Sequence, residues 1–449
     1  MAHTLGPVAA LLLGVFFLVS GSGLQNTLLP LRGAFEGFSA IDLGILGSSY
    51  YLGFVAGCLG VPHLVRRSGH IRTFAALTAG VVATMMAHPL LIDPYVWFGL
   101  RAITGFCFAG LYLVIESWLN DRATNQTRGL VMGSYVMVDY VALTAGQMMI
   151  TLFPVRSFDL FAIGTILFAL ATLPVVVSTT AQPAPIETAR IRLFRLMREA
   201  PVGVVGCFVI GLTNGSLWSL GPIFAIGRGL TADGAATFMS AVVVAGAIAQ
   251  WPVGYLSDRM DRRRILAALM VGSLLAGLAL GALDLGLVGL CVLGFVFGAV
   301  SLPAYSLAAA HAYDRTPAAR AVETAAGLLL AYGLGSVAGP AAASYGITHY
   351  GPGAFFFFTA ACHTFLLLFV VWRLCVREAP GPADTITTDP IAAAPPTGTV
   401  PMLDMTGDPA ADEEVVASVA DSAQVASEER RRAEGETFLQ PQDGRSNGA

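Results

Sequence analysis

The sequence contains no lysine, and charged residues of any kind are scarce. Asp, Glu, Lys and Arg together make up 12% of the 449 residues, whereas hydrophobic residues make up 55%. A soluble globular chain carries about 25% charged residues. This deficit excludes an ordinary water-soluble domain and favours a chain that is surrounded largely by lipid.

Motifs for common enzyme chemistry and for metal binding are also missing. The sequence has no P-loop, no GxSxG, no HExxH and no CxxC pair. Its six cysteines stand singly in apolar segments, where we expect them to act as small hydrophobic residues. We therefore predict no enzyme, no ATP-driven pump, no metal, no cofactor and no nucleic-acid partner. An intramembrane hydrolase, the enzymatic alternative, would need a paired nucleophile and base.

Long uncharged runs recur along the chain. At a rise of about 1.5 Å per residue, a helix of about 20 residues crosses a hydrocarbon core about 30 Å thick. Apolar runs without alternation exclude a β-barrel, so we predict an all-α membrane protein. The twelve predicted transmembrane helices are 8–30, 42–64, 73–92, 96–118, 129–153, 158–178, 201–224, 234–256, 265–284, 286–311, 322–346 and 353–375.

The two halves of the chain repeat at a shift of about 190 residues. Gly23-Leu24-Gln25-Asn26 aligns with Gly211-Leu212-Thr213-Asn214, and Gly105-Phe106-x-Phe108 aligns with Gly294-Phe295-x-Phe297. Because six is an even number of spans, both halves have the same orientation. Two pseudo-symmetric six-helix bundles are therefore expected, with a solute site at their interface near mid-membrane.

The arginines predict the orientation of the chain and the limits of its parts. Connections on one face carry seventeen arginines, whereas those on the opposite face carry only Arg32, Arg156 and Arg228. By the positive-inside rule, both termini are cytoplasmic. The predicted parts are an N-terminal bundle (1–180), a cytoplasmic linker (181–200), a C-terminal bundle (201–376) and an acidic, disordered cytoplasmic tail (377–449). The linker contains a predicted amphipathic segment, for which a solvated linker with incidental charge is the alternative.

Two motifs resemble those of a known transporter family. Gly254-Tyr255-Leu256-Ser257-Asp258-Arg259-Met260-Asp261-Arg262-Arg263 resembles the loop signature G-x-L-x-D-R-x-G-R-R of the major facilitator superfamily, or MFS. Arg101-x-x-Thr104-Gly105 resembles the second motif of that superfamily, and Glu116-Ser117-Trp118-Leu119-Asn120 resembles its YcaD-like bacterial branch. The resemblance covers roughly residues 8 to 376.

The resemblance implies a secondary transporter that works by alternating access in the bacterial inner membrane. We expect a monomer that moves a small molecule, with proton-coupled efflux of metabolites or amphiphilic compounds as the leading interpretation. Span 129–153 lacks the Gly-Pro signature usual in the antiporters, which weakens the efflux assignment. Uptake, facilitated diffusion and a transporter-like membrane sensor remain as alternatives. Deleting the chain after Glu378 should silence a sensor that signals through its tail but leave a transporter active.

The signature loop is predicted to gate the cytoplasmic side of the transporter. Gly254 permits close helix packing, and Asp258 can lie against the positive N-terminal dipole of a helix from the other half. Arg262, Arg263 and Arg264 are expected to hold the cytoplasmic side, and Arg259 belongs to the same gating loop. A solvated loop that obeys only the positive-inside rule is the alternative.

The matching loop of the first half departs from this pattern. Arg66 stands where the family has an aspartate, and Glu116 stands near a position where the superfamily often has a base. We therefore expect a charge-swapped latch, in which Arg66 or Arg67 pairs with Glu116 when the cytoplasmic gate is closed.

Two charges are expected inside the membrane, where a charge is costly and rarely retained without a role. Asp139 should lie roughly 15 Å deep and Arg101 roughly 9 Å below the opposite surface. We expect them to form a pair or to share a water-filled cavity, with Asp139 as the proton-accepting carboxylate. A static ion pair that only fixes two helices is the alternative.

Polar and aromatic side chains near the expected interface form a candidate solute site. Amides and phenols can orient a solute through hydrogen bonds, and aromatic faces supply apolar contact. Asn26 and Asn214 occupy equivalent positions and are expected on opposite walls, although hydrogen bonding between helices would also explain them. The candidates are Gln25, Asn26, Tyr50, Tyr112, Tyr135, Gln147, Asn214, Trp218, Gln250, Tyr305 and Tyr332.

Overall fold

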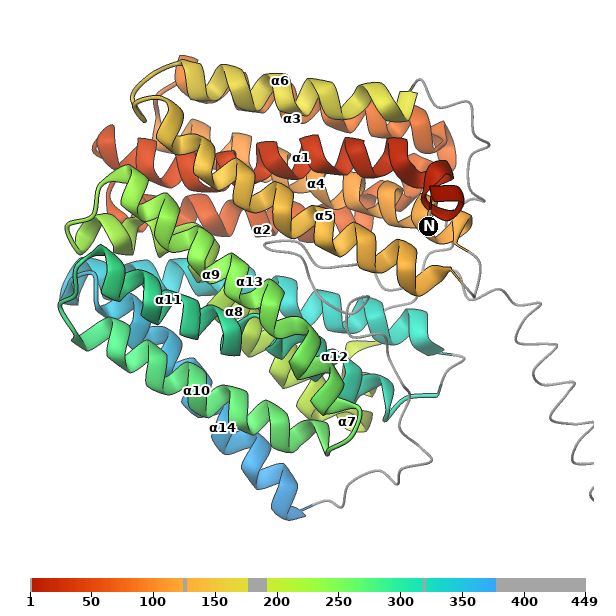
Figure 1. The fold of residues 1–449 in the computed structure, drawn as a ribbon, viewed down its shortest axis with the longest axis vertical. Coiled ribbons are helices and arrows are strands. Elements are labelled where there is room, and N and C mark those ends of the chain that lie inside the picture. The colour runs from red at the N-terminus through yellow and green to blue at the C-terminus, as the bar shows by residue number, and fades with distance from the viewer. Residues whose placement is uncertain (1, 124–126, 177–191, 318–319, 377–449) are drawn as a thin grey trace, which may run out of the picture. The chain divides into compact units, whose positions relative to one another are not determined.

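Long α-helices make up almost all of the computed structural model (Figure 1). The structure describes residues 2–123, 127–176, 192–317 and 320–376, all of which belong to one compact unit, Met1–Met405. The predicted acidic tail and residues 181–191 of the predicted linker lie outside these ranges. Among the described residues, twelve helical segments are long and apolar enough to cross a membrane, and each begins and ends within a few residues of a predicted span.

The helices follow one another without any strand in the described part of the chain. The first half consists of α1 (Ala2–Phe35), α2 (Ala40–Ser68), α3 (His70–Leu90), α4 (Pro94–Arg122), α5 (Arg128–Met148) with the short 3-10 helix η1 (Met149–Leu152), and α6 (Asp159–Val176). The second half consists of α8 (Pro201–Gly227), α9 (Ala232–Ser257), α10 (Arg262–Ala282), α11 (Leu287–Ser301), α12 (Ala304–Tyr313), α13 (Ala321–Tyr350) and α14 (Ala354–Val376).

The span predicted at 286–311 is not one continuous helix. Its first part is α11 and its second part is α12, and the two are separated at Leu302 and Pro303. Proline lacks a backbone N–H and its ring clashes with the preceding turn, which breaks a helix. Together the two pieces still form a single candidate span, Leu287–Tyr313.

Polar residues at the helix starts explain why the predicted boundaries are nearly correct. Ser39 and Asp42 form a reciprocal capping box at the start of α2. Asp93 accepts hydrogen bonds from two backbone N–H groups of α4, and Pro94 follows it at the first helical position. Thr231 caps α9 in the same way. Such residues satisfy the exposed N–H groups of a first turn and so fix where each helix begins.

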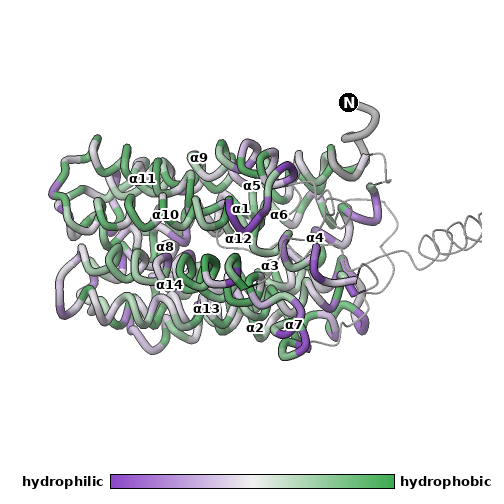
Figure 2. Tube along the Cα trace, turned by 90° about the horizontal axis from the view of Figure 1, so that it is seen from below, coloured by the Kyte–Doolittle hydropathy of each residue, from purple (hydrophilic) through white to green (hydrophobic). Residues whose placement is uncertain are grey.

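The outer faces of the helices are apolar, as expected for a protein in lipid. Leu52, Val288 and Leu368 lie in predicted spans, yet they are 59%, 77% and 64% exposed. Figure 2 shows hydrophobic residues along the middle of the helices and hydrophilic segments concentrated near their ends. Exposed apolar surface over this many helices is costly in water and favourable in a bilayer.

Close backbone packing repeats in the two halves. In the first half, a Cβ added to Gly23 of α1 would overlap the backbone oxygen of Leu143 in α5. In the second half, a Cβ added to Gly211 of α8 would overlap the backbone oxygen of Tyr332 in α13. The two pairs are related by nearly the same shift as the sequence repeat, so the predicted internal repeat is confirmed. The division into bundles at 1–180 and 201–376 stays a prediction.

The two halves contact each other most closely toward the end with few arginines. Gly44 and Gly47 of α2 allow close approach to Ser344 of α13 and Ser219 of α8. On a second pair of helices, Ser240 of α9 donates a hydrogen bond to Gln147 of α5 at 3.3 Å. Figure 1 shows α5 and α9 diverging from this contact toward their other ends.

The described part of the predicted linker forms a short helix, α7 (Leu193–Glu199). Leu196 is buried and packs beside Gly327 of α13, whereas Phe194 is 88% exposed. Arg320 donates hydrogen bonds at 3.0 Å to both carboxylate oxygens of Glu199. The helix therefore has one apolar side chain against the second half and another exposed beside arginines, while an amphipathic segment on the lipid surface stays a prediction.

Candidate functional site

The guanidinium of Arg101 lies deep in the protein between α1 and α2. Arg101 is only 7% exposed, and its Nη2 donates a hydrogen bond to Asn26 Oδ1 at 3.1 Å. Its Cζ lies 4.4 Å from the centre of the Tyr50 ring, in a cation–π arrangement. Its Nη1 has no hydrogen-bond partner among the described residues. Tyr50 thus holds one face of the guanidinium and Asn26 holds one nitrogen, whereas the buried Nη1 is available to donate a hydrogen bond.

The expected pair between Arg101 and Asp139 is absent from the described contacts. Arg101 contacts Asn26 and Tyr50 instead, while Asp139 is fully buried on α5. The physical reason is the packing of the helices: α5 packs mainly against α1 and only slightly against α4, and it is Asn26 of α1 that contacts Arg101. The expected depths of Arg101 and Asp139 in the membrane were therefore not enough to predict which residues contact Arg101.

Asp139 belongs instead to a group of polar side chains near the middle of the first half. Tyr135 lies one helical turn before Asp139 on α5, and its Oη donates a hydrogen bond to Glu116 Oε1 of α4 at 3.4 Å. Tyr135 interacts electrostatically with both Glu116 and Asp139, and also with Tyr112. We call Glu116, Tyr135 and Asp139 the carboxyl cluster. All three residues are at most 2% exposed, so two carboxyl groups lie close to one phenol inside the membrane.

Glu116 lies deeper than the latch hypothesis assumed. It interacts with Cys58 of α2, which precedes Arg66 by eight residues, or about 12 Å of helix. Its charge also acts weakly on Tyr305 of α12, in the other half. Arg66 and Arg67 are exposed and form no ion pair with any described residue. The charge-swapped latch is absent from this structure and stays a prediction for a state in which the cytoplasmic ends meet.

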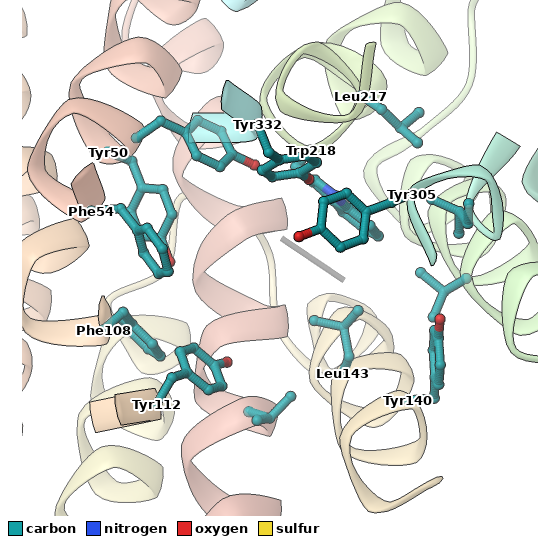
Figure 3. Packing of buried hydrophobic residues seen from close by; sticks show 14 of the residues in the cluster. Tyr50, Phe54, Phe108, Tyr112, Tyr140, Leu143, Leu217, Trp218, Tyr305 and Tyr332 are labelled. Atoms are coloured by element: carbon teal, nitrogen blue, oxygen red, sulfur yellow. The ribbon is translucent and has the colours of Figure 1, made fainter. Parts of the chain in front are cut away.

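Aromatic residues from both halves face one another beside these polar groups. Figure 3 shows Tyr50 and Tyr112 of the first half opposite Trp218, Tyr305 and Tyr332 of the second half. The rings of Tyr305 and Tyr332 are T-shaped, with centres 5.1 Å apart. All five residues are buried. The predicted aromatic candidates are therefore brought together, whereas their role in solute binding stays a prediction.

Two of the predicted glutamines form hydrogen bonds between helices. Gln250 of α9 donates to Ser306 of α12 at 2.7 Å, and Gln147 accepts from Ser240 across the halves at 3.3 Å. Such contacts stabilise helix association in lipid and use part of each amide. Both residues are buried. Because each hydrogen bond uses only part of the amide, a role of these two residues in solute binding stays a prediction.

The paired asparagines differ in their surroundings. Asn26 accepts the hydrogen bond from Arg101, whereas Asn214 lies within hydrogen-bonding reach of Tyr332. The Oδ1 of Asn214 and the Nε2 of Gln25 are buried and have no hydrogen-bond partner among the described residues. Helices α1 and α8 are in contact, so the two asparagines lie on neighbouring helices from opposite halves.

The signature loop forms an ion-pair network at the arginine-rich end of the second half. Arg262 contacts Asp258 and the buried Asp314, each at 3.4 Å, and Arg263 contacts Asp261 at 2.8 Å. Burial raises the pKa of Asp261, but hydrogen bonds from Arg263 more than offset this effect and hold the pKa below its ordinary value. These ion pairs all lie within the second half, so the predicted contact of Asp258 with a helix of the other half stays a prediction.

Two further loop residues have separate contacts. The guanidinium of Arg259 stacks over the Tyr255 ring at 3.6 Å, and Gly254 is buried at the end of α9. Sequence reasoning missed Asp314 as a partner of Arg262. At about the shift of the internal repeat, Asp314-Arg315 matches Asp121-Arg122 of the first half, but this match did not indicate a contact with Arg262.

Metal binding receives no support from side-chain clustering in the described ranges. No group of three or more His, Cys, Asp and Glu residues there could hold a metal ion. All six cysteines lie in the described residues, and none forms a disulfide.

Comparison with known proteins identifies the family. The family model described as the Major Facilitator Superfamily matches residues 11–328 and 204–410. An uncharacterized MFS-type transporter, YcaD, from Escherichia fergusonii is 27% identical over 367 residues, which is 81% of this chain and 95% of that protein. A second MFS-type transporter, from Enterobacter sp. strain 638, is 29% identical over 376 residues, covering 83% and 97% of the two chains.

Solved structures share the fold at low sequence identity. The nucleoside transporter NupG superimposes with a TM-score of 0.70 at 13% identity, covering 82% of this chain and 98% of that one. A bacterial homologue of the human lysosomal transporter Spinster, in an inward-facing and occupied conformation, gives a TM-score of 0.65 at 13% identity and covers 86% and 98% of the two chains.

The predicted fold, family and absence of enzymatic activity are thus confirmed. The chain belongs to the major facilitator superfamily, and it is a multi-pass membrane protein that transports a small molecule across the lipid bilayer.

Proposed function

We propose that this protein is a secondary active transporter that works by alternating access and couples solute movement to protons through Asp139 and Glu116. The observation that carries the proposal is the carboxyl cluster, in which both acids lie beside Tyr135 and are almost completely buried. A carboxylate inside the membrane is costly to keep charged, so exchange of a proton with the solvent would change the energy of each conformation.

The position of the cluster supports coupling between protonation and movement of the halves. The charge of Glu116 acts weakly on Tyr305, which lies in the second half directly after the break at Pro303. A change in the charge of Glu116 would therefore act on a side chain of the opposite half. Coupling needs such differential interaction, because a proton can shift an equilibrium only by binding two states with different affinity.

Contacts between the halves support alternating access. They include Gln147 with Ser240 and Gly44 with Ser344, all toward the arginine-poor end. With the positive-inside rule, this end faces away from the cytoplasm and both termini face the cytoplasm of a bacterial inner membrane. The arrangement then corresponds to a carrier that is closed toward the outside, and rocking of the halves would open this end while it closes the cytoplasmic end.

Efflux of amphiphilic compounds or metabolites is the proposed direction. The aromatic residues at the interface, among them Trp218 and Tyr305, would suit a solute with an apolar body. Uptake is the alternative. Proteoliposomes of known orientation, loaded with a defined mixture of carboxylates, nucleosides and sugars, would decide this point when mass spectrometry follows loss or gain of each compound under an imposed proton gradient.

Proton coupling can be tested without knowing the solute. Protein in a solid-supported membrane, given a rapid pH jump, should produce a transient current as buried carboxyls take up protons. Asp139→Asn and Glu116→Gln should each reduce this current, whereas Asp139→Glu should retain it with a shifted pH midpoint. Asp233→Asn is the matched control, because Asp233 lies in the first turn of α9, away from the carboxyl cluster.

Each result bears directly on the coupling role. A current from Asp139→Asn and Glu116→Gln that equals the wild-type current in size and pH midpoint would contradict the proposal. Loss of the current in Asp233→Asn as well would indicate a surface charge effect and would equally count against the cluster.

A further inference from the structure

Arg101 presents a buried positive charge without a carboxylate partner in the described part of the chain. It is 7% exposed, and its contacts are the Asn26 oxygen and the Tyr50 ring. A neutral amide and an aromatic face compensate only part of the cost of burying a guanidinium. A buried arginine of this kind is therefore suited to an anion that arrives from outside the protein.

The geometry of Arg101 also suits recognition of an oxyanion. Asn26 fixes Nη2 and Tyr50 fixes one face, so the orientation of the planar group is set before any ligand binds. The Nη1 donor is buried and has no hydrogen-bond partner among the described residues. Guanidinium groups hold carboxylates through short, charge-assisted hydrogen bonds, and a preoriented group loses little freedom when it does so.

The surroundings of Arg101 extend to the other half of the molecule. Tyr50 of α2 lies in the first half and Tyr332 of α13 lies in the second, and α2 packs against α13. Tyr332 in turn lies within hydrogen-bonding reach of Asn214 of α8. Asn214 has a buried Oδ1 with no hydrogen-bond partner in the described ranges. Figure 3 shows Tyr50 and Tyr332 side by side, with Trp218 next to Tyr332. A solute whose anionic group contacts Arg101 would therefore lie beside aromatic rings from both halves and beside the Asn214 oxygen of the second half.

From these contacts we infer that the transported solute is a carboxylate with an apolar or aromatic body, and that Arg101 binds its carboxylate. The inference rests on the proposed transport of a solute, and it is independent of proton coupling. It assigns different roles to charges that the sequence suggested as a pair: the carboxyl cluster for protons and Arg101 for the solute.

Matched chemical probes test this inference by binding alone. Purified protein is titrated with benzoate, 3-phenylpropionate and 5-phenylpentanoate, and in parallel with the corresponding amides, while thermal unfolding is followed. A ligand that binds only the folded state raises the melting temperature. At least one carboxylate should raise it in a saturable manner, and its amide should bind about tenfold more weakly or worse, because it lacks the charge.

Variants then locate the binding group. Arg101→Gln should lose the response to carboxylates, and Arg101→Lys should retain a weaker one. Arg72→Gln is the control, because Arg72 is exposed near the start of α3 and should leave binding unchanged. Asn26→Asp provides an independent test: a carboxylate placed beside Nη2 should raise the melting temperature of the ligand-free protein and abolish the response to added carboxylates.

The outcomes separate this inference from the proposed function. Asp139→Asn should still bind carboxylates even though its proton current is reduced. The inference is overturned if no carboxylate in the series raises the melting temperature, if amides bind as well as carboxylates, or if Arg101→Gln responds like the wild type. Failure of the proton current with intact carboxylate binding would count only against the coupling role.

Discussion

Gln147 at the end of α5 accepts a hydrogen bond from Ser240 of α9 at 3.3 Å, and this contact joins the two halves of the chain. Both residues are buried, at 1% and 7% exposure. The helices that carry them diverge from this point, so the contact marks one end of the interface (Figure 1). In an alternating-access carrier, a contact of this kind must break in every transport cycle.

Cross-linking this contact should stop transport. In a background without the six native cysteines, Gln147→Cys and Ser240→Cys would be joined by a short bifunctional thiol reagent with a reducible spacer. We expect transport of any identified solute to fall close to zero and to recover after reductive cleavage of the link. Each single cysteine variant with the same reagent is the control. Full activity of the cross-linked protein would show that the halves do not separate at this end.

The repeated glycine packing predicts paired destabilising substitutions. A Cβ on Gly146 would overlap the backbone oxygen of Ser20, and a Cβ on Gly335 would overlap the backbone oxygen of Phe208. Because backbone on both sides resists displacement, Gly146→Ala and Gly335→Ala should each destabilise the protein by about 1–3 kcal/mol. Thermal unfolding in detergent measures the effect.

A glycine in open surroundings serves as the control for this prediction. Gly99 lies in α4, and an added Cβ there would meet no atom within 4 Å. Gly99→Ala should therefore be neutral or stabilising by about 0.4–1 kcal/mol, through loss of chain entropy in the unfolded state. Equal melting temperatures for Gly146→Ala, Gly335→Ala and Gly99→Ala would contradict the packing.

The contact between Glu199 and Arg320 should hold α7 against the second half in a pH-dependent manner. Hydrogen bonds from Arg320 hold the pKa of the Glu199 carboxyl below its ordinary value. A lowered folded-state pKa means that the contact contributes fully at neutral pH and is lost as the pH falls through that lowered pKa. Hydrogen exchange of α7 should therefore accelerate at acidic pH beyond the intrinsic pH dependence of exchange.

Substitutions separate this contact from general acid effects. At neutral pH, Glu199→Gln and Arg320→Gln should increase hydrogen exchange in α7 to a similar extent, and high salt should reduce the difference from the wild type. Arg198→Gln is the control, since Arg198 is exposed on the same helix. Unchanged exchange in both Glu199→Gln and Arg320→Gln would mean that Leu196 alone holds the helix.

Sequence reasoning located the spans well because lipid imposes strong constraints on composition. Uncharged runs fixed the helices, and capping residues such as Ser39 and Asp93 fixed their starts. The repeat at Gly23 and Gly211 also appears in the packing, because close backbone approach requires glycine at both positions. The helix break was missed because high hydropathy across Leu287–Tyr313 concealed the effect of Pro303.

The contacts of the charged residues could be predicted from the sequence much less well than the positions of the helices. The rise of a helix gives the depth of Arg101 and Asp139, but it does not give the direction in which each side chain points. Glu116 was assigned to the cytoplasmic surface because it lies near the end of α4, yet it is buried beside Tyr135. The spacing of Tyr135 and Asp139, four residues apart on one helix, was a signal that could have linked them.

The most direct test of the account is a pair of distance measurements in the same protein. Spin labels at Arg67→Cys and Met260→Cys report on the arginine-rich end, and labels at Tyr95→Cys and Tyr350→Cys report on the opposite end; none of the four positions is buried. Pulsed electron resonance would measure both distances in nanodiscs at neutral and mildly acidic pH, with and without a bound carboxylate. We expect populations in which the distance at the arginine-rich end shortens while the distance at the opposite end lengthens, or the reverse. Two distances that stay constant, or that change in the same direction under every condition, would contradict alternating access.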